Sequence, residues 1–194
     1  DLDLASHYFQ QALEIDPNVS GAWHQLARIN FLRGNFDQAL EKINWQIALR
    51  GDSMMSSYYV RGLIGGYAGK LDEAERDFKK FITWDERNWA AWNDLAWIYF
   101  QKGNFAKTEE AARHGLQWNR GNPWLLTSLG VALLNQGRRD EAAVVFEEAL
   151  AASLRLGIAD WHRAYPGNHP LAAGDGLAEM KSTIEYNLSL VKSF

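Results

Sequence analysis

Three sets of residues recur along this chain of 194 residues with a period of 34 or 35, and the three sets shift together. Glycines stand at Gly34, Gly69, Gly103 and Gly137. Small residues follow five positions later, at Ala39, Ala74, Thr108 and Ala142, with Ala5 one period upstream. Large apolar residues precede the glycines by eleven positions, at Trp23, Tyr58, Trp92 and Leu126. A period of this length indicates one supersecondary unit copied several times, which predicts a stack of repeats instead of a globular fold around one core.

The segment from Asn88 to Phe105 shows the repeated unit most clearly. Its apolar stripe has the spacing of a helix and consists of Trp92, Leu95, Ala96 and Tyr99. Gly103 then ends the helix, and a second amphipathic segment runs from Ala106 to Trp118. The unit is therefore predicted to be a helix, a tight turn and a second helix.

This unit resembles the tetratricopeptide repeat, whose pattern is Trp-x2-Leu-Gly-x2-Tyr, then Ala-x3-Phe, then Pro, with a period of 34. The residues that match are Trp92/Leu95/Ala96/Tyr99, Trp23/Leu26/Ala27, Leu129/Gly130, Ala74/Phe78, Ala142/Phe146, and Ala5/Phe9 followed by Pro17. Two units depart from the pattern in the second helix. The position of the Phe in Ala-x3-Phe is occupied by Ile43 in one unit and by Ala112 in the other. The resemblance covers about residues 1–156 and implies an all-α fold, a right-handed α-solenoid of helix-turn-helix repeats.

The repeats predict how a single solenoid domain over residues 1–194 is divided. Residues 1–19 are expected to be a half repeat with only its second helix, which frays or pairs with another copy. Full repeats are expected at 20–54, 55–88, 89–122 and 123–156, with the one extra residue of the first period in 51–53. Residues 157–174 are expected to be an extension and loop, in which the preceding helix runs on to Tyr165. A last helix over 175–193, capped by Asp175, is expected to cover the end of the stack.

The helical periodicity separates packing residues from surface residues. At about 100° per residue, the large apolar anchor and the sites three, four and seven later share one face, which packs against neighbouring helices. Sites one, five and eight later lie on a second face, and the resemblance implies that this face lines a concave groove. The groove residues predicted in this way, with two at its edges, are His24, Arg28, Phe31, Tyr59, Leu63, Tyr67, Asn93, Trp97, Phe100 and Trp124. Trp23, Trp84, Trp92 and Trp118 are expected to lie in the core.

The second face is rich in aromatic residues although stacking does not need them there. Exposed aromatic clusters are enriched in interaction surfaces, so we expect a non-enzymatic scaffold that binds a partner peptide or helix in an aromatic groove. The alternative for Trp97 and Phe100 is that their rings only pack on neighbouring first helices. Two other functions stay open at this point: a self-assembling homo-oligomeric scaffold, and a regulatory or interaction domain of a larger protein.

Some members of the resembling family hold an acidic C-terminal tail with a clamp of lysine, asparagine and arginine. The corresponding face here carries His24 and Arg28, then Val60, then Ala90 and Asp94. A C-terminal carboxylate would meet one arginine and a repelling aspartate, so we do not expect binding of a chaperone tail.

Composition excludes several classes of site. The net charge of −4, with both signs scattered, disfavours a nucleic-acid partner. The chain has no cysteine, and therefore no disulfide, thiolate metal site or cysteine nucleophile. No apolar run reaches the roughly 18–20 residues that cross a bilayer. The compartment is undetermined, with the cytoplasm slightly favoured, and a first residue of Asp instead of Met is compatible with loss of a targeting segment or with a piece of a longer protein.

Motifs for catalysis and cofactors are weak. The glycine-rich segment 61–70 departs from a phosphate-binding loop, which needs Gly where Ile64 stands and Ser or Thr where Leu71 stands. His162, His169, Asp160 and Asp175 have no familiar metal-ligand spacing. We expect no cofactor, no metal and no enzymatic activity.

Overall fold

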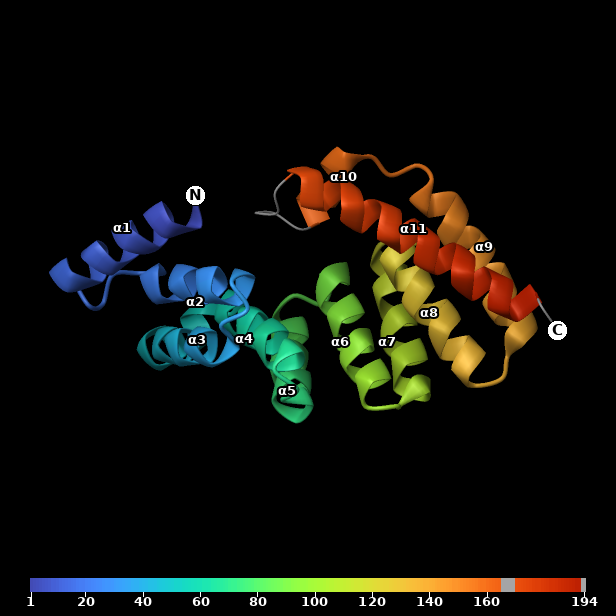
Figure 1. Cartoon of the computed structure of the whole chain (residues 1–194). Helices are drawn as coiled ribbons and strands as arrows, with labels where there is room; N and C mark the ends of the chain where they lie inside the picture. The colour runs from blue at the N-terminus through green and yellow to red at the C-terminus, as the bar shows by residue number, and fades with distance from the viewer. Residues whose placement is uncertain (165–169, 193–194) are drawn as a thin grey trace. The chain divides into compact units, whose positions relative to one another are not determined.

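A computed structural model of the chain describes residues 1–164 and 170–192, and the secondary structure of this part is helical (Figure 1). The first helices are α1 (Leu2–Ile15), α2 (Ala22–Leu32), α3 (Phe36–Arg50), the 3₁₀ turn η1 (Gly51–Met54), α4 (Ser56–Tyr67) and α5 (Leu71–Trp84). They are followed by α6 (Trp89–Gln101), α7 (Phe105–Trp118), α8 (Pro123–Asn135), α9 (Arg139–Ser153), α10 (Ile158–Ala164) and α11 (Pro170–Lys192). The predicted all-α fold of helix-turn-helix repeats is confirmed.

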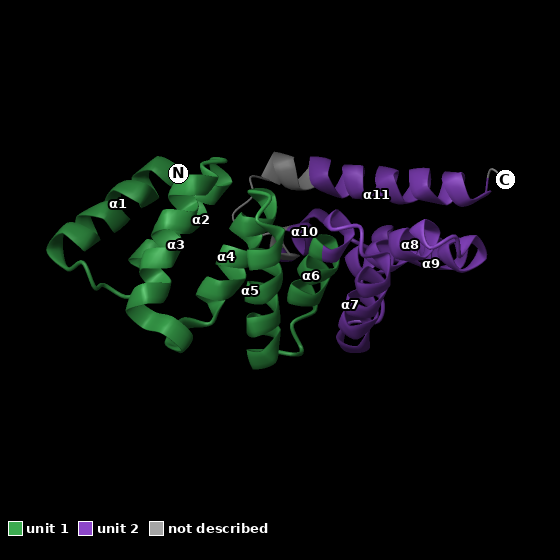
Figure 2. Cartoon of the chain, turned by 90° about the horizontal axis from the view of Figure 1, so that it is seen from below, with its two compact units in different colours: residues 1–98 green, residues 99–194 purple. Residues whose placement is uncertain are grey.

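Contacts divide the chain into two compact units, residues 1–98 and residues 99–194, and the boundary falls within α6 (Figure 2). The expected division of one solenoid domain into numbered repeats stays a prediction. The two units are described separately below.

The periodic glycines terminate the first helix of each repeat. Gly34, Gly69, Gly103 and Gly137 have φ between 69° and 76°, in the left-handed region where a side chain is strained. The amide of the residue after each glycine donates to the carbonyl five positions upstream, as in Asn35 to Asn30 at 2.9 Å and Arg138 to Leu133 at 3.0 Å. The glycine amide donates to the carbonyl three positions upstream. These are Schellman motifs, which satisfy the last carbonyls of the helix and turn the chain back.

The small-residue set lies where the two helices of a repeat approach each other. Ala39, Ala74 and Ala142 have no exposed surface, and Thr108 is 1% exposed. Opposite them, Gly62 and Gly130 lie against the rings of Phe78 and Phe146. A Cβ atom on Gly130 would lie 2.6 Å from the Phe146 ring, so this position admits only hydrogen. The prediction of close helix packing at these sites is confirmed.

The core of unit 1 lies between α2, α3 and α4. Its buried residues are Ala27, Ala39, Leu40, Ile43, Val60 and Ile64. Helix α1 packs on α2 through Leu13, Ala22 and Leu26, and the Asp1 carboxylate caps α1 by accepting from the amides of Asp3 and Leu4. Each helix from α1 to α5 thus contacts the next one in the chain, as in a repeat stack.

In unit 2, α11 covers α8 and α9. Leu126, Ala149, Ala152 and Ile184 form one buried cluster, with Met180 packed against it. Helix α10 also packs on α11, and Gly176 lies against the indole of Trp161. The long last helix therefore shields apolar surface that a further repeat would otherwise cover.

Three expectations near helix ends are wrong. Helix α9 ends at Ser153 instead of running on to Tyr165, and Asp160 accepts a 2.8 Å hydrogen bond from the Gly157 amide where α10 begins. Helix α11 begins at Pro170 instead of Asp175, since proline suits a first helical turn. Trp84 and Trp118 are 64% and 43% exposed because they are the last residues of α5 and α7, beyond the buried stripe. The rest of the expected loop, residues 165–169, lies outside the described residues.

One ion pair joins the two helices of the repeat formed by α4 and α5. The Arg61 guanidinium donates to both oxygens of Asp77 at 2.7 and 2.8 Å, and to Asn44 of α3 at 3.0 Å. Asp77 is 5% exposed, so its charge depends on this partner. Asp77 in turn raises the pKa of Arg61 above its ordinary value.

The substitution Arg61→Ala should lower the free energy of unfolding by about 3 kcal/mol, because it leaves a buried carboxylate without a cation. Lys79→Ala removes an exposed cation paired with Glu75 on α5, and should cost less than about 0.5 kcal/mol. Urea denaturation of the two variants measures the difference. Equal losses would show that burial of Asp77 does not set the strength of its ion pair.

Candidate functional site

Four aromatic rings on α2, α3, α4 and α6 pack against one another within unit 1. This group, which we call the aromatic ladder, consists of Phe36, Phe31, Tyr67 and Trp97, and Tyr67 contacts each of the other three rings. Ring centroids lie 6.0 Å apart for Phe36 and Phe31, 5.3 Å for Phe31 and Tyr67, and 5.1 Å for Tyr67 and Trp97. Tyr67 is 59% exposed, whereas the other three are partly buried. The ladder is thus a preformed aromatic surface with one prominent exposed ring.

Glycine at position 66 brings the last ring of the ladder into place. A Cβ atom on Gly66 would lie 2.6 Å from the Trp97 ring and 2.9 Å from Ile98. The Trp97 ring therefore rests directly on the backbone of α4, which a side chain at position 66 would prevent. Trp97 thus packs between α4 and α6, as one of the two alternatives for this residue expected, and its ring is also part of the ladder. Its contact with a partner stays a prediction.

A carboxylate lies beside the ladder. The Tyr59 hydroxyl on α4 donates to Oδ2 of Asp94 on α6 at 2.6 Å. The Tyr59 ring is itself fixed against Phe78 and Phe81 of α5, with centroids 5.6 and 5.1 Å away. Burial raises the pKa of Asp94 to about 6, although hydrogen bonds from Tyr59 and Asn93 oppose this shift. Partial burial and the charge on Asp94 also raise the pKa of Tyr67. The surface therefore combines aromatic rings with a carboxylate whose charged form is disfavoured by burial.

His24, one of the predicted groove residues, is only 6% exposed. Its amide donates to the Gln46 side chain at 3.3 Å, and its Nδ1 lies 3.2 Å from the Ser57 hydroxyl. Burial, followed by the nearby charge of Arg28, lowers the pKa of His24 to about 4, so the imidazole is neutral at pH 7. His24 links α2, α3 and α4 and offers no open surface to a partner.

The other predicted groove residues of unit 1 are at least partly accessible. Arg28, Leu63 and Asn93 are partly exposed, and Arg28 donates to Gln25 at 3.4 Å. Together with the aromatic ladder and with Tyr59 and Asp94, Leu63 completes what we call the ladder surface. Sequence reasoning treated Asp94 only as a group that repels carboxylates and did not include Phe36. The signal that could have found the contact is spacing, because Tyr59 and Asp94 stand 35 residues apart on successive first helices, one residue more than the period of 34.

Two predicted groove residues belong to unit 2. Phe100 is 37% exposed and packs against Phe105, with ring centroids 5.8 Å apart. Trp124 is partly buried against Trp161 of α10, at 5.7 Å between centroids. Helix α10 thus covers part of the Trp124 ring.

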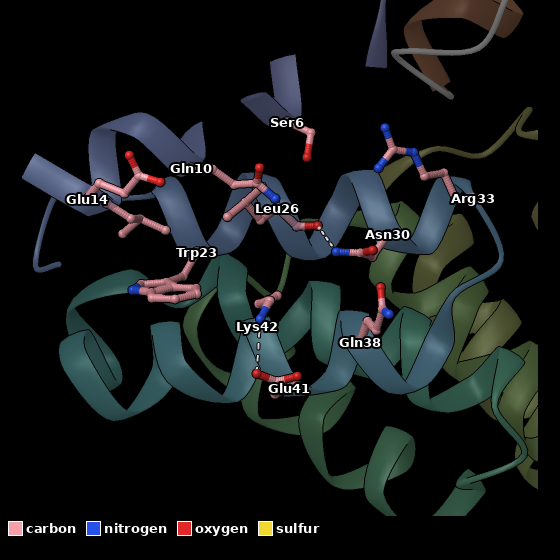
Figure 3. A pocket seen from close by; sticks show the side chains of 11 residues that line it. Ser6, Gln10, Glu14, Trp23, Leu26, Asn30, Arg33, Gln38, Glu41 and Lys42 are labelled. Atoms are coloured by element: carbon pink, nitrogen blue, oxygen red, sulfur yellow. Dashed lines mark hydrogen bonds and ion pairs between the residues drawn. The ribbon is translucent and has the colours of Figure 1, made fainter. Parts of the chain in front are cut away.

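An open pocket of about 580 Å³ lies between α1, α2 and α3 (Figure 3). Most of the residues that line it are polar, among them Gln10, Glu14, Asn30 and Gln38, while Trp23 lies at one end. Its cations are already paired, Lys42 with Glu41 and Arg33 with Asp3, and Asn30 donates to the Leu26 carbonyl. The pocket therefore offers fewer free binding groups than the ladder surface.

Other kinds of site are not evident in residues 1–164 and 170–192. No group of three or more histidine, aspartate or glutamate side chains there could hold a metal, and the side chains of His162 and His169 lie outside the described set. No helix within that part of the chain has both the length and the apolar character to cross a membrane.

Comparison with protein families matches three segments of the chain to tetratricopeptide repeat models, at residues 8–41, 59–116 and 124–156. Together the three segments cover more than half of the chain. The chain belongs to the tetratricopeptide repeat family. The stacked helical repeats of this family are protein-interaction scaffolds with extended binding surfaces.

Curated relatives resemble only part of the chain. Tetratricopeptide repeat protein 36 of Mus musculus is 32% identical over 83 residues, which are 41% of this chain and 45% of that protein. Anaphase-promoting complex subunit 3 of Schizosaccharomyces pombe is 25% identical over 126 residues, 65% of this chain and 19% of that protein. The matches therefore span less than half the length of these relatives.

Solved structures resemble more of the chain. The crystal structure of MamA has a TM-score of 0.74 at 23% identity and covers 80% of this chain and 90% of that one. YrrB, described as a tetratricopeptide repeat protein with an unusual peptide-binding site, has a TM-score of 0.65 at 15% identity, with coverage of 95% and 92%. At these identities the likeness shows the fold.

Gly66 and Gly65 should respond to alanine in opposite directions. Gly66→Ala should lower the free energy of unfolding by about 1–2 kcal/mol, because the added methyl group collides with Trp97 and Ile98. Gly65→Ala should raise it by up to about 1 kcal/mol, since its Cβ would be 3.7 Å from the nearest atoms and alanine favours helix. Denaturation monitored by tryptophan fluorescence measures both, and a stabilising Gly66→Ala would contradict the described packing of Trp97.

The buried imidazole of His24 should make the tetratricopeptide repeats of unit 1 less stable in acid. Because its pKa is about 4 in the fold and about 6.5 when unfolded, the unfolded chain binds the additional proton as pH falls between these values. The contribution of His24 to the free energy of unfolding is fully present above pH 6.5 and should fall by about 3 kcal/mol by pH 4.

The raised pKa of Asp94 makes the folded chain more stable as pH falls below about 6, which opposes the effect of His24. The pH dependence of the wild type alone therefore does not isolate His24. The measurement is the difference in unfolding free energy between the wild type and His24→Gln at each pH. A constant difference from pH 7 to pH 4 would contradict the burial of a neutral imidazole.

Proposed function

We propose that the ladder surface of unit 1 binds a peptide segment of a partner protein, and that the chain has no chemistry of its own. The observation that carries this proposal is the group of four packed rings in which Tyr67, 59% exposed, contacts the other three. Rigid aromatic side chains supply contact area at low cost in conformational entropy and are enriched among the residues that dominate binding energy. The fold and the peptide-binding site described for YrrB are consistent with this function.

The geometry favours a peptide over a small molecule. The ladder spans four helices, α2, α3, α4 and α6, and it is a surface of side chains instead of an enclosed cavity. A bound segment could place successive side chains against Phe31, Tyr67 and Trp97, each of which desolvates apolar area. Desolvation at about 25 cal/mol per Å² of apolar surface would supply most of the affinity.

Selection from a displayed library of random peptides tests the proposal. Immobilised wild-type protein should enrich a family of peptides, and Tyr67→Ala should weaken their binding by about 10-fold or more, as expected for a central aromatic contact. Tyr8→Ala is the matched control, because Tyr8 is a 61% exposed tyrosine on α1, away from the ladder. Equal effects of the two substitutions, or no enrichment by the wild type, would refute the proposal.

A second candidate function is self-assembly, which a particular surface of α1 favours. Leu4, Tyr8 and Ile15 share one face of that helix and are 51%, 61% and 87% exposed. Neighbouring apolar side chains this exposed are typical of interaction surfaces, so a second copy could cover this face. Sedimentation equilibrium distinguishes the two candidates: a concentration-dependent mass that Leu4→Lys with Ile15→Lys abolishes would support assembly, and a constant monomer mass would exclude it.

A further inference from the structure

The carboxylate of Asp94 has no cationic partner in the described part of the chain. Its recorded contacts are the Tyr59 hydroxyl at 2.6 Å and the side chain of Asn93. None of the ion pairs between described residues includes Asp94. The buried Asp77 differs, because Nε and Nη2 of Arg61 donate to its two carboxylate oxygens. A carboxylate in this environment gains from any cation that can reach it.

The surroundings of Asp94 suit a cationic side chain. Trp97 stands three residues later on α6, so the two share one face of the helix, and the Tyr67 ring lies 5.1 Å from Trp97. The rings present π faces that attract an ammonium or guanidinium group, and the carboxylate accepts its hydrogen bonds. Tyr59 is fixed on Phe78 and Phe81 and occupies one oxygen of Asp94, which orients the carboxylate before a ligand arrives.

The charges around this point also discriminate between ligands. On the neighbouring helices, the titratable groups that face Asp94 are Tyr59 and Tyr67 of α4, and the one predicted groove cation, Arg28, lies on α2. An acidic side chain at Asp94 would meet repulsion. The net charge of −4 adds a weak field that favours basic segments at a distance.

We propose that Asp94, framed by Tyr67 and Trp97, receives an arginine or lysine side chain of the bound peptide. The proposal rests on the proposed peptide-binding function of the ladder surface and names the class of partner, a segment with a basic residue beside apolar ones. The raised pKa of Asp94 agrees with it, because a bound cation would restore the charged form that burial disfavours.

Peptide selection with charge variants tests the proposal. The displayed random library should yield arginine or lysine at one recurring position with the wild type, and this preference should vanish with Asp94→Asn. The asparagine can still accept the Tyr59 hydrogen bond and removes a buried charge, so this variant is expected to fold. Asp37→Asn is the matched control, since it removes the same charge from an exposed site in the first turn of α3 and should keep the preference.

Affinity measurements then distinguish the effect of the peptide's positive charge from that of its side-chain shape. For one selected peptide, replacing the preferred arginine by its neutral analogue citrulline, or the preferred lysine by norleucine, should weaken binding to the wild type by about 10- to 100-fold. With Asp94→Asn the two forms should bind alike. The wild type should also lose affinity for the cationic peptide as pH falls through about 6, whereas Asp94→Asn should not.

The outcomes distinguish this inference from the function on which it rests. Peptides that depend on Tyr67 but show no basic preference, or bind Asp94→Asn unchanged, would overturn the role of Asp94 and leave peptide binding intact. A wild type that enriches no peptide would overturn both.

Discussion

The close approach of helices at positions without a side chain underlies the whole structure. Gly62 and Gly130 receive the rings of Phe78 and Phe146, and the alanines and threonine opposite them are fully or almost fully buried. Since a repeat stack has no central core, its stability is a sum of such contacts between neighbouring helices. The same device recurs between repeats, where the missing Cβ of Gly66 allows Trp97 to rest on α4. Packing and the presentation of an aromatic surface therefore depend on one kind of contact.

Buried polar groups in unit 1 differ in how completely they are satisfied. Asp77 has a bidentate arginine, and neutral His24 has Ser57 and Gln46, so both link helices within the fold. Among the described residues, Asp94 contacts only neutral donors, although it is a carboxylate in a partly buried position. Incomplete satisfaction is costly, and in folded proteins such groups are concentrated at sites that bind something else. This difference is what separates the ladder surface from the better paired pocket between α1, α2 and α3.

The sequence predicted the fold well because the repeat imposes helix phase on every unit. The periodic glycines and the alanines that follow them depend only on local geometry, and the structure confirms both. The burial of residues at the ends of helices was harder to predict. Trp84 and Trp118 continue an apolar stripe but extend beyond the helix that would cover them. The break after Ser153 was missed because an uninterrupted stripe is equally compatible with two successive helices.

The site was only partly predictable for a related reason. Helical phase placed Phe31, Tyr67 and Trp97 on one kind of face, yet it also placed His24 there. The helical phase does not show that α3 and α4 pack against the start of α2, where His24 contacts Ser57 and Gln46 and is buried. The hydrogen bond between Tyr59 and Asp94 depends on how successive repeats pack, which no single helix encodes.

The 3₁₀ turn at Gly51–Met54 lies between α3 and α4, so a change in its length does not change the position of any residue within a helix. It accommodates the one longer period outside both α3 and α4, and Asp52 ties it to the next repeat through Tyr58 and Lys80. A repeat can therefore gain a residue at this junction, outside both helices, while the ladder surface keeps its helical phase. Connections of this type let a repeat array vary in length while the faces of its helices keep their geometry.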